Sequence, residues 1–336
     1  PEGGEVYLPE GTYTITSPIQ IPSNVTLRGA GPSTILYLAD GVNDSVIKNS
    51  DTTDGNTNIH LLDFKIIGND AGNSGNCDGV YFYNVSYSKI ENLYIEDVED
   101  EGISIAGGDY NVITNNYLRN GGSQAGTSAI SIGCGGSSSC YGKYNVVSNN
   151  VIENWTGPAV MVSEWTPGKT QYNIVANNTA LNVSGYFGSI GILKADHNSV
   201  IGNIIKGGSY SGIVVSKGAN YNTVSGNVIT EKADHGIALD DGSDYNVVSS
   251  NTIQNVTDDG IYLSGDSDYN VISSNIFENN GGYDINISSS YCDGNYLIGN
   301  NIEKPIQDNG TATKYQMDEE MRLAKEALFT LGNIND

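Results

Sequence analysis

The stretch Tyr245–Ile253, YNVVSSNTI, decides the fold because it recurs along the chain. It returns as YNVVSNNVI from Tyr144, YNTVSGNVI from Tyr221 and YNVISSNIF from Tyr269, so the last copies begin 24 residues apart. A second pattern moves with it, reading GIVVS, GIALD and GIYLS in successive units. Self-similarity at a fixed period is typical of solenoids, in which each unit packs only on its neighbours. Each unit therefore contains at least two short β-branched strands and polar turns.

Asparagine recurs six places after the first residue of each copy: Asn116, Asn150, Asn178, Asn203, Asn227, Asn251 and Asn275. Neighbouring strands of a stacked solenoid lie about 4.8 Å apart, so these amides would form an internal ladder that satisfies buried polar groups. We predict an all-β fold, a single-stranded right-handed parallel β-helix of about a dozen coils. His197 takes the place of the copy's first tyrosine, and we interpret it as a member of the same column.

The two ends of the chain differ from the repeat. We expect a β-helix domain over residues 1–310 and a C-terminal tail over residues 311–336. Within the tail, MDEEMRLAKEALFTLG from Met317 has acids at its start and apolar residues on one helical stripe, which predicts a short amphipathic helix that caps the last coil or links to another domain. Because the chain begins at Pro1 without a leader, we interpret it as part of a longer protein with further domains.

Composition and charge exclude several classes of partner. The net charge is −24 with only 15 basic residues, which argues against nucleic acid and against an anionic membrane surface. No apolar run approaches the roughly 20 residues of a membrane span, so we expect no membrane insertion. Nine N-x-S/T sequons favour an extracellular or cell-surface protein. Of the four cysteines, Cys134 and Cys140 bracket a loop short enough to close as a disulfide, whereas Cys77 and Cys292 have no evident partner.

The stretch GGEVYLPEGTYTITSPIQIPSNVTLRGAGPSTIL, from Gly3 to Leu36, resembles the opening of secreted β-helix proteins of the pectate-lyase superfamily, which includes polygalacturonases and mannuronan epimerases. The later Asn-rich copies are similar to the generic repeat of carbohydrate-active β-helix proteins. Together these resemblances cover about residues 3–305. They imply a polysaccharide partner and specify the fold more closely than the reaction.

Alignment of the repeat places one histidine among three aspartates. The two columns just before the strand glycine read Tyr210, Asp234 and Asp258, and then Ser211, His235 and Asp259. Adjacent coils would set Asp234 beside Asp258 and His235 beside Asp259, with backbones about 5 Å apart. Like charges this close should raise the pKa of at least one carboxyl. We therefore predict catalytic residues Asp234, His235, Asp258 and Asp259, acting as general acids and bases on a glycosidic bond; the alternative is acidic turns that merely stack.

Family motifs leave the reaction open at this point. The triplets DDG at Asp258 and DHG at Asp234 look like strand motifs of polygalacturonases, but their order is reversed and no Arg-x-Lys follows. The DPH motif of mannuronan epimerases is missing. We expect no required cofactor and assign no metal ligands, although stacked aspartates make a structural calcium ion an alternative.

A second region suggests a substrate-binding surface. The copies at Tyr110, Tyr144 and Tyr172 stand 34 and 28 residues apart, so loops leave the rod here, and loops on a rigid scaffold often carry function. We predict substrate-binding residues Trp155, Glu164, Trp165 and Tyr262. Flat aromatic faces suit sugar rings, and the alternative for each tryptophan is a packed loop hydrophobe.

The leading hypothesis is a secreted polysaccharide-degrading enzyme, a glycoside hydrolase that cleaves an extracellular matrix glycan containing uronate or amino sugar. The sequon density, Asn-rich coils and acidic balance resemble the disaggregatases of methanogenic archaea, which implies a matrix-degrading role, although no motif carries that resemblance. One alternative is a non-catalytic cell-surface scaffold or glycan-binding module. A second is a polysaccharide lyase or epimerase.

Overall fold

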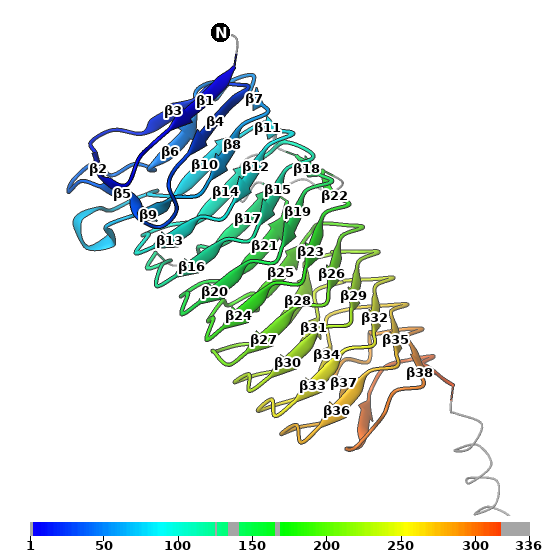
Figure 1. The fold of residues 1–336 in the computed structure, drawn as a ribbon. Coiled ribbons are helices and arrows are strands. Elements are labelled where there is room, and N and C mark those ends of the chain that lie inside the picture. The colour runs from blue at the N-terminus through cyan, green and yellow to red at the C-terminus, as the bar shows by residue number, and fades with distance from the viewer. Residues whose placement is uncertain (1–2, 125, 134–140, 165–168, 317–336) are drawn as a thin grey trace, which may run out of the picture.

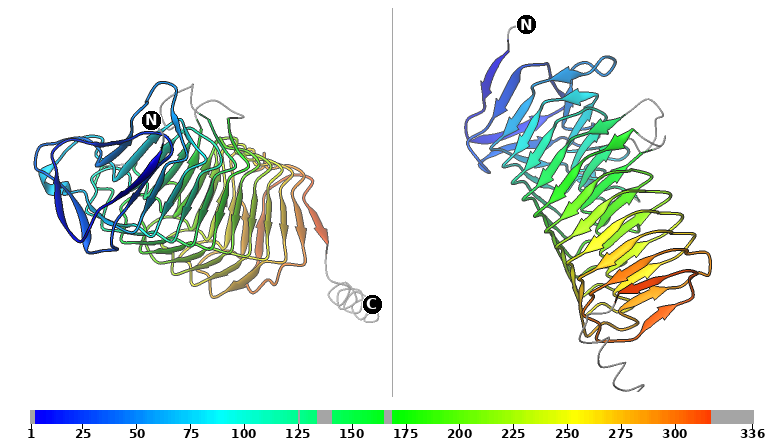
Figure 2. Two further views of the ribbon diagram at one scale, coloured as in Figure 1. Left: turned by 45° about the horizontal axis from the view of Figure 1, so that its top comes forward. Right: turned by 90° about the vertical axis from the view of Figure 1, so that its right-hand side faces the viewer.

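A computed structural model describes residues 3–124, 126–133, 141–164 and 169–316. The chain winds into a rod of stacked coils, a parallel β-helix as the repeat predicts (Figure 1). Two further views show the coils following one axis from the N-terminal to the C-terminal end (Figure 2). Three long parallel sheets, named A, B and C here, form its faces and contain 13, 11 and 12 strands.

Sheet A contains β1 (Gly4–Tyr7), β4 (Val25–Arg28), β8 (His60–Leu62), β12 (Lys89–Glu91), β15 (Val112–Thr114), β19 (Val146–Ser148), β23 (Ile174–Ala176), β26 (Ser199–Ile201), β29 (Thr223–Ser225), β32 (Val247–Ser249), β35 (Val271–Ser273), β38 (Tyr296–Ile298) and β40 (Lys314–Gln316). Sheet B contains β2 (Gly11–Ile15), β5 (Thr34–Leu38), β9 (Lys65–Ile67), β13 (Tyr94–Glu96), β16 (Tyr117–Arg119), β20 (Val151–Glu153), β24 (Thr179–Leu181), β27 (Ile204–Lys206), β30 (Val228–Thr230), β33 (Thr252–Gln254) and β36 (Ile276–Glu278).

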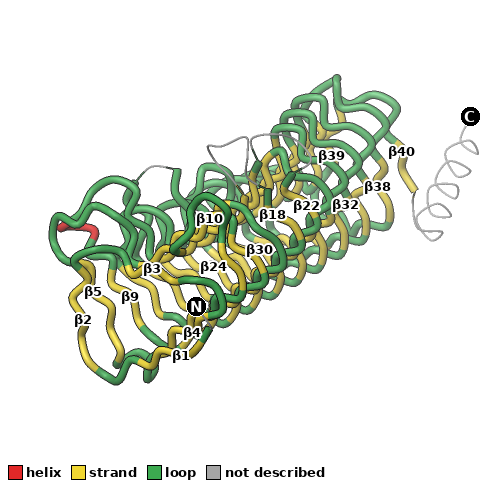
Figure 3. The backbone as a smooth tube through the Cα atoms, turned by 90° about the horizontal axis from the view of Figure 1, so that it is seen from above, coloured by secondary structure: helices red, strands yellow, loops and turns green. Residues whose placement is uncertain are grey.

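Sheet C contains β3 (Ile19–Ile21), β6 (Ile47–Asn49), β10 (Val80–Tyr83), β14 (Ile103–Ala106), β17 (Ile130–Gly133), β21 (Val160–Ser163), β25 (Ile190–Leu193), β28 (Ile213–Ser216), β31 (Ile237–Leu239), β34 (Ile261–Leu263), β37 (Ile285–Ile287) and β39 (Ile306–Asp308). Two small sheets pair β7 (Asn56–Thr57) with β11 (Val85–Ser86) and β18 (Gly142–Lys143) with β22 (Thr170–Gln171). A single turn of 3-10 helix, η1 (Asp70–Gly72), is drawn red near the N-terminal end in Figure 3.

Two asparagine ladders hold neighbouring coils in register. In the predicted ladder, the side-chain nitrogen of Asn203 donates to Asn227 Oδ1 at 2.9 Å and to the carbonyl of Val175 at 2.9 Å. A second ladder, which the repeat contains but we did not predict, uses the asparagine after each tyrosine; Asn222 donates its backbone N–H to Asn246 Oδ1 at 2.8 Å. These buried amides satisfy one another and the backbone, so the coil interior tolerates polar side chains.

A stack of aromatic rings follows one edge of the rod. Tyr221 and Tyr245 lie 5.2 Å apart between ring centroids with planes 7° apart, and His197 stands in the same stack, 5.2 Å from Tyr172 and 5.1 Å from Tyr221. The interpretation of His197 as a column member is therefore confirmed.

The C-terminal end and the cysteines differ in how far the structure describes them. Strand β40 pairs with β38, so sheet A extends into the segment predicted to be a tail. The predicted helix from Met317 and the cysteine pair Cys134–Cys140 lie outside the described residues, whereas Cys77 and Cys292 are buried free thiols. In the part of the chain that the structure describes, no helix is long and apolar enough to cross a membrane.

Candidate functional site

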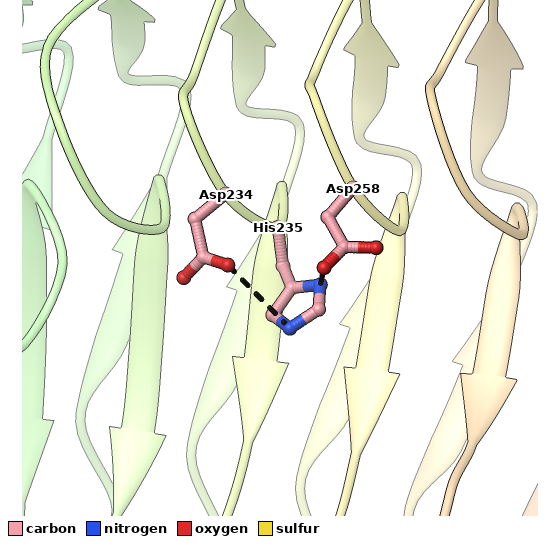
Figure 4. A group of neighbouring side chains, drawn as sticks. All are labelled: Asp234, His235 and Asp258. Atoms are coloured by element: carbon pink, nitrogen blue, oxygen red, sulfur yellow. Dashed lines mark ion pairs between the residues drawn. The ribbon is translucent and has the colours of Figure 1, made fainter.

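The four predicted catalytic residues lie in the turns that lead into β31 and β34. These strands pair in parallel with Ile237 opposite Ile261, which sets His235 opposite Asp259 and Asp234 opposite Asp258. The carboxylates of Asp234 and Asp258 flank the imidazole (Figure 4). The structure therefore brings together the residues that the column alignment selected, and we call Asp234, His235, Asp258 and Asp259 the histidine cluster.

The imidazole of His235 lies close to all three carboxylates. Its Nε2 is 3.7 Å from Asp234 Oδ1, and its Nδ1 is 3.9 Å from Asp258 Oδ2 and 3.5 Å from Asp259 Oδ2. The backbone N–H of Asp259 donates to Nδ1 at 3.2 Å. Nδ1 thus accepts a backbone hydrogen bond, and Nε2 lies on the side of Asp234.

Neighbouring groups hold the histidine cluster in place. Asp259 is only 3% exposed, and its two oxygens accept hydrogen bonds from the backbone N–H of Tyr283 at 2.7 Å and from Asn286 Nδ2 at 2.8 Å. Ser211 donates its hydroxyl to Asp234 at 2.7 Å. The Tyr262 ring stacks on the imidazole with centroids 4.3 Å apart and planes 3° apart. Donors thus surround the buried carboxylate, while Asp258 remains exposed.

Of the predicted substrate-binding residues that the structure describes, Trp155 and Glu164 are buried. Trp155 is 1% exposed and its ring packs against the backbone of Gly121 and Gly122, so neither face is open to a sugar, and the prediction is wrong for this residue. Glu164 is buried and accepts hydrogen bonds from the backbone N–H groups of Lys169 and Thr170, which closes its own loop. Trp165 lies outside the described residues, and Tyr262 is half-buried against His235.

Lys232 is a buried cation near the histidine cluster that the sequence did not reveal. It is 1% exposed, and its amine donates to the carbonyl of Gly207 at 2.8 Å and to the hydroxyl of Ser189 at 2.9 Å. Burial lowers the pKa of this amine to about 8, and the charge of Asp234 opposes that shift. Its ammonium is committed to oxygens of earlier coils, so it supports those turns rather than the carboxylates.

A second group of carboxyls surrounds a cavity of about 450 Å³ at the N-terminal end of sheet C. The lining residues come from the turns and strands around β6, β10 and β14, and are Asn43, Asp44, Ser45, Lys48, Asn76, Asp78, Tyr81, Asp100 and Glu101. We call this cavity the acidic pocket. Lys48 is its one cation, and it forms an ion pair with Asp44.

The carboxyls of the acidic pocket face one another in a poorly solvated site. Asp78 is 3% exposed and accepts hydrogen bonds from the Ser45 hydroxyl at 3.0 Å and the backbone N–H of Glu101 at 3.1 Å. Burial, with the charges of Glu101 and Asp100 second, raises the pKa of Asp78 well above its usual value. Burial and the charge of Glu99 raise the pKa of Asp100 to about 6.

The pKa of Glu101 rises further, to about 7. Burial is the largest cause, the charge of Asp100 adds to it, and hydrogen bonds to the hydroxyls of Ser104 and Ser131 oppose it. Near neutral pH the pocket therefore holds an ionised Asp100 beside a partly protonated Glu101. One carboxyl that donates a proton and one that accepts it are the pair required for general acid/base cleavage of a glycosidic bond.

The sequence contains a signal for the acidic pocket that lies outside the regular copies. Val80 pairs with Ile103, so Asp78 and Glu101 occupy the column that holds His235 and Asp259 further along the rod. The triplets DGV and EGI at these positions match HGI and DGI in the histidine cluster. The N-terminal coils are irregular in length, whereas the column alignment rests on the regular 24-residue copies.

Comparisons with known proteins agree with this architecture. The family model described as "Rhamnogalacturonase A/epimerase, pectate lyase-like" matches residues 1–180. The model described as "Periplasmic copper-binding protein (NosD)" matches residues 122–243 and 172–334. The pre-neck appendage protein of Bacillus phage phi29 is 36% identical over 104 residues, a match that spans 29% of this chain and only 12% of that protein.

Solved structures share the fold at low sequence identity. The A-module of a mannuronan C-5 epimerase from Azotobacter vinelandii superimposes with a TM-score of 0.68 at 18% identity, over 94% of this chain and 89% of the module. The tailspike protein of E. coli bacteriophage HK620 gives 0.66 at 16% identity over 91% and 60% of the two chains. An exopolygalacturonase from Thermotoga maritima gives 0.61 at 11% identity over 89% and 84%. At these identities the likeness establishes the fold and not the reaction.

Proposed function

The chain belongs to the rhamnogalacturonase A/epimerase, pectate lyase-like family and, in its later coils, to the NosD family, and on this premise we propose that it degrades a polysaccharide by hydrolysis. In this proposal the acidic pocket is the catalytic site. Glu101 protonates the leaving oxygen of the glycosidic bond, and Asp100 acts on the opposite side of the sugar as base or nucleophile.

The single observation that carries this proposal is the convergence of Asp78, Asp100 and Glu101 on one cavity of about 450 Å³. Burial raises the pKa of each of these carboxyls, that of Asp100 to about 6 and that of Glu101 to about 7, so the cavity holds carboxyl groups that can carry a proton near neutral pH. Buried carboxyls with raised pKa values in one cavity mark candidate acid/base sites.

The charge of the acidic pocket favours an uncharged sugar at the bond that is cleaved. Its carboxyls outnumber its one lysine, and Lys48 is already paired with Asp44. A uronate in this position would meet like charges, which also disfavours the lyase and epimerase alternatives, because both need a neutralised uronate. In a glycan that contains uronate and amino sugar, the pocket would accept the amino sugar.

The partner and the location follow from the same proposal. A rod with stacked turns offers an extended face along sheet C, which suits a long glycan better than a small molecule. The chain shares its fold with an epimerase and a polygalacturonase that are named for polysaccharides, and with a phage tailspike. From these names we infer an extracellular or surface-exposed site of action. No cofactor is required in this proposal.

The test is a cleavage assay on uronate-containing and amino-sugar-containing glycans. Reducing ends and the ultraviolet absorbance of unsaturated uronate are measured for the wild type, for the pocket variants Asp100→Asn and Glu101→Gln, and for the cluster variants Asp234→Asn and Asp258→Asn. We expect new reducing ends without an absorbance gain, activity lost in the pocket variants, and activity kept in the cluster variants.

Each other outcome points to a different assignment. Loss of activity in the cluster variants alone would return catalysis to the histidine cluster, as the sequence predicted. A rise in absorbance together with reducing ends would mean elimination. Binding without cleavage of any glycan would leave the non-catalytic scaffold or glycan-binding module.

A further inference from the structure

A second cavity lies on sheet B, on a different face of the rod from the acidic pocket. It measures about 290 Å³ and lies over β5, β9, β13 and β16, which are neighbours in that sheet (Figure 1). Its lining includes Ile35, Lys65, Tyr94, Glu96, Tyr117 and Arg119, and we call it the basic pocket. From this lining we propose that the basic pocket binds a uronate sugar, with the carboxylate at Lys65 and Arg119 and the sugar ring against Tyr94.

The register of sheet B brings these side chains together. Lys65 pairs with Tyr94, and Tyr94 pairs with Tyr117, so three successive coils contribute to one column. Glu96 pairs with Arg119 in a second column. Residues two apart on a strand point to the same face of the sheet, and Tyr94 and Arg119 are exposed. Both columns therefore lie on the outer face of the rod.

The charges of Lys65 and Arg119 exceed that of the carboxylate between them. Glu96 Oε1 forms an ion pair with Lys65, and its Oε2 lies 2.9 Å from Arg119 Nε and 2.8 Å from Nη2. Burial acts to raise the pKa of Glu96, but the hydrogen bonds from the two cations lower it overall, so this carboxylate stays ionised. An ammonium has three N–H donors and a guanidinium has five, so both cations keep donors for a further anion.

Tyr94 supplies an open ring beside these cations. Its ring centroid is 6.1 Å from that of Tyr117, and the two planes are tilted by 55°, so the rings do not cover each other as parallel rings would. The guanidinium of Arg119 lies 6.0 Å from the Tyr117 centroid, whereas Tyr94 is 41% exposed. Aromatic rings with a few placed polar groups commonly line small-molecule sites. A sugar ring can therefore lie on Tyr94 while its carboxylate meets the cations.

The charge balance of the chain selects an acidic sugar as the ligand. With 39 acidic and 15 basic residues, the chain as a whole repels a uronate, and in the acidic pocket Lys48 is already paired with Asp44. The basic pocket sets two cations against one carboxylate, and the paired N–H groups of a guanidinium match the geometry of a carboxylate. A free inorganic anion would use the cations and leave Tyr94 without a role.

The basic pocket lies near the acidic pocket along the chain. Glu96 ends β13, and Asp100 follows four residues later in the turn that leads to β14. Four extended residues span at most about 14 Å, so a glycan of a few sugars can place a uronate in the basic pocket and an uncharged sugar in the acidic pocket. That link rests on the proposed function, whereas binding of the uronate does not.

The experiment measures binding by calorimetry with a tetrasaccharide of alternating glucuronate and N-acetylated amino sugar. The full chain carries Glu101→Gln to prevent cleavage in the acidic pocket, and reducing ends measured in the same solution report any cleavage that remains. We expect affinity at least tenfold lower in Arg119→Gln and in Lys65→Gln, and about 2- to 10-fold lower in Tyr94→Leu. The same tetrasaccharide with its carboxyls reduced to alcohols should bind at least tenfold more weakly.

Lys206→Gln is the matched control for Arg119→Gln. Lys206 occupies the column of Arg119 three coils further along sheet B, where it forms an ion pair with Glu231. Both substitutions remove one positive charge from the same face, but only Arg119 lines the basic pocket. The control should therefore bind the tetrasaccharide as tightly as the parent chain does.

The same titrations contain the results that would overturn the proposal. Heat equal to that of buffer, unchanged affinity in both Arg119→Gln and Lys65→Gln, or equal affinity for the reduced tetrasaccharide would remove the uronate site. An equal loss in Lys206→Gln would mean attraction to the overall charge. Inorganic phosphate that binds as tightly as the tetrasaccharide would mean an anion site without sugar recognition. Melting curves show whether each variant is folded, and Tyr94→Leu tests the site without altering an ion pair. Cleavage that persists in Glu101→Gln contradicts the proposed function and leaves these binding results unaffected.

Discussion

The acidic pocket and the histidine cluster occupy the same two columns of the coil, yet the groups that surround their buried carboxyls differ. Glu101 and His235 are five coils apart, which corresponds to about 24 Å along the rod. In the pocket, carboxyls face carboxyls, and the pKa of Asp78, Asp100 and Glu101 is raised. In the cluster, the buried Asp259 receives a backbone N–H and an amide. Asp78 also accepts two hydrogen bonds, so the difference lies in the neighbouring groups: Asp78 faces the carboxyls of Glu101 and Asp100, whereas Asp259 faces the imidazole of His235.

The largest expected effect is on catalysis, and it separates the two regions directly. Glu101→Gln removes the proton donor of the proposed reaction while keeping the side chain's shape, so kcat should fall by about 10²- to 10⁴-fold. Asp258→Asn, on an exposed carboxylate of the other region, should stay within about threefold of the wild type. The initial rate of reducing-end release is the measurement. An equal loss of rate in both variants would contradict the assignment of catalysis to the acidic pocket alone.

The next largest effect is on stability and concerns Asp259, the buried carboxylate of the histidine cluster. Asp259→Ala leaves the backbone N–H of Tyr283 and the amide of Asn286 without their acceptor in a buried place. Each orphaned group costs about 1 to 3 kcal/mol, so we expect a loss of about 3 kcal/mol in the free energy of unfolding. Urea unfolding followed by circular dichroism measures it, with Asp266→Asn as the exposed control, because asparagine also adopts the positive φ of 62° found at this position. A loss below about 0.5 kcal/mol would show that these donors find other partners.

Replacing Glu101, whose pKa is raised, should increase the free energy of unfolding instead of lowering it. The folded-state pKa of Glu101, about 7, lies above its ordinary value of 4.5, so the unfolded chain loses this proton first and stability falls as pH rises between these values. Glu101→Gln carries no proton to lose. We expect the variant to gain about 3 kcal/mol over the wild type at about pH 8 and almost nothing at about pH 4. A constant difference across this range would contradict a raised pKa.

The pH dependence of cleavage should show the same pair of groups. Below about 6 Asp100 gains a proton and stops acting as base, and above about 7 Glu101 loses its proton and stops acting as acid. The rate should therefore peak between about pH 6 and 7 and fall about tenfold one unit beyond each side of that range. Asp258→Asn should keep both limbs of the profile. An optimum above about pH 9 would exclude Glu101 as the acid.

The sequence was sufficient for the fold and for one of the two clusters, for reasons that particular residues make clear. The ladder asparagines from Asn178 to Asn275 repeat every 24 or 25 residues. Residues at equal positions in successive coils of a parallel solenoid lie side by side, so the convergence of His235 and Asp259 could be predicted. Trp155 could not be placed, because the sequence shows that a loop leaves the rod but not which way its ring turns. Asp78 and Glu101 could not be aligned with these columns, because copies of 34 and 28 residues separate them from the regular repeat. Their raised pKa depends on burial, which spacing does not report.

The smallest expected effect concerns Tyr262, which the sequence marked as a substrate ligand and the structure stacks on His235. A stacked ring pair contributes about 0.5 to 1.5 kcal/mol beyond its buried area, so Tyr262→Leu should lower the free energy of unfolding by about 1 kcal/mol. Tyr262→Phe keeps the ring and removes only the hydroxyl, so it should be as stable as the wild type. Urea unfolding and the KM for the glycan separate the two roles. A packing role leaves KM unchanged in Tyr262→Phe, whereas a severalfold rise in KM would mean that the hydroxyl contacts the sugar and that the glycan reaches from the acidic pocket to the histidine cluster.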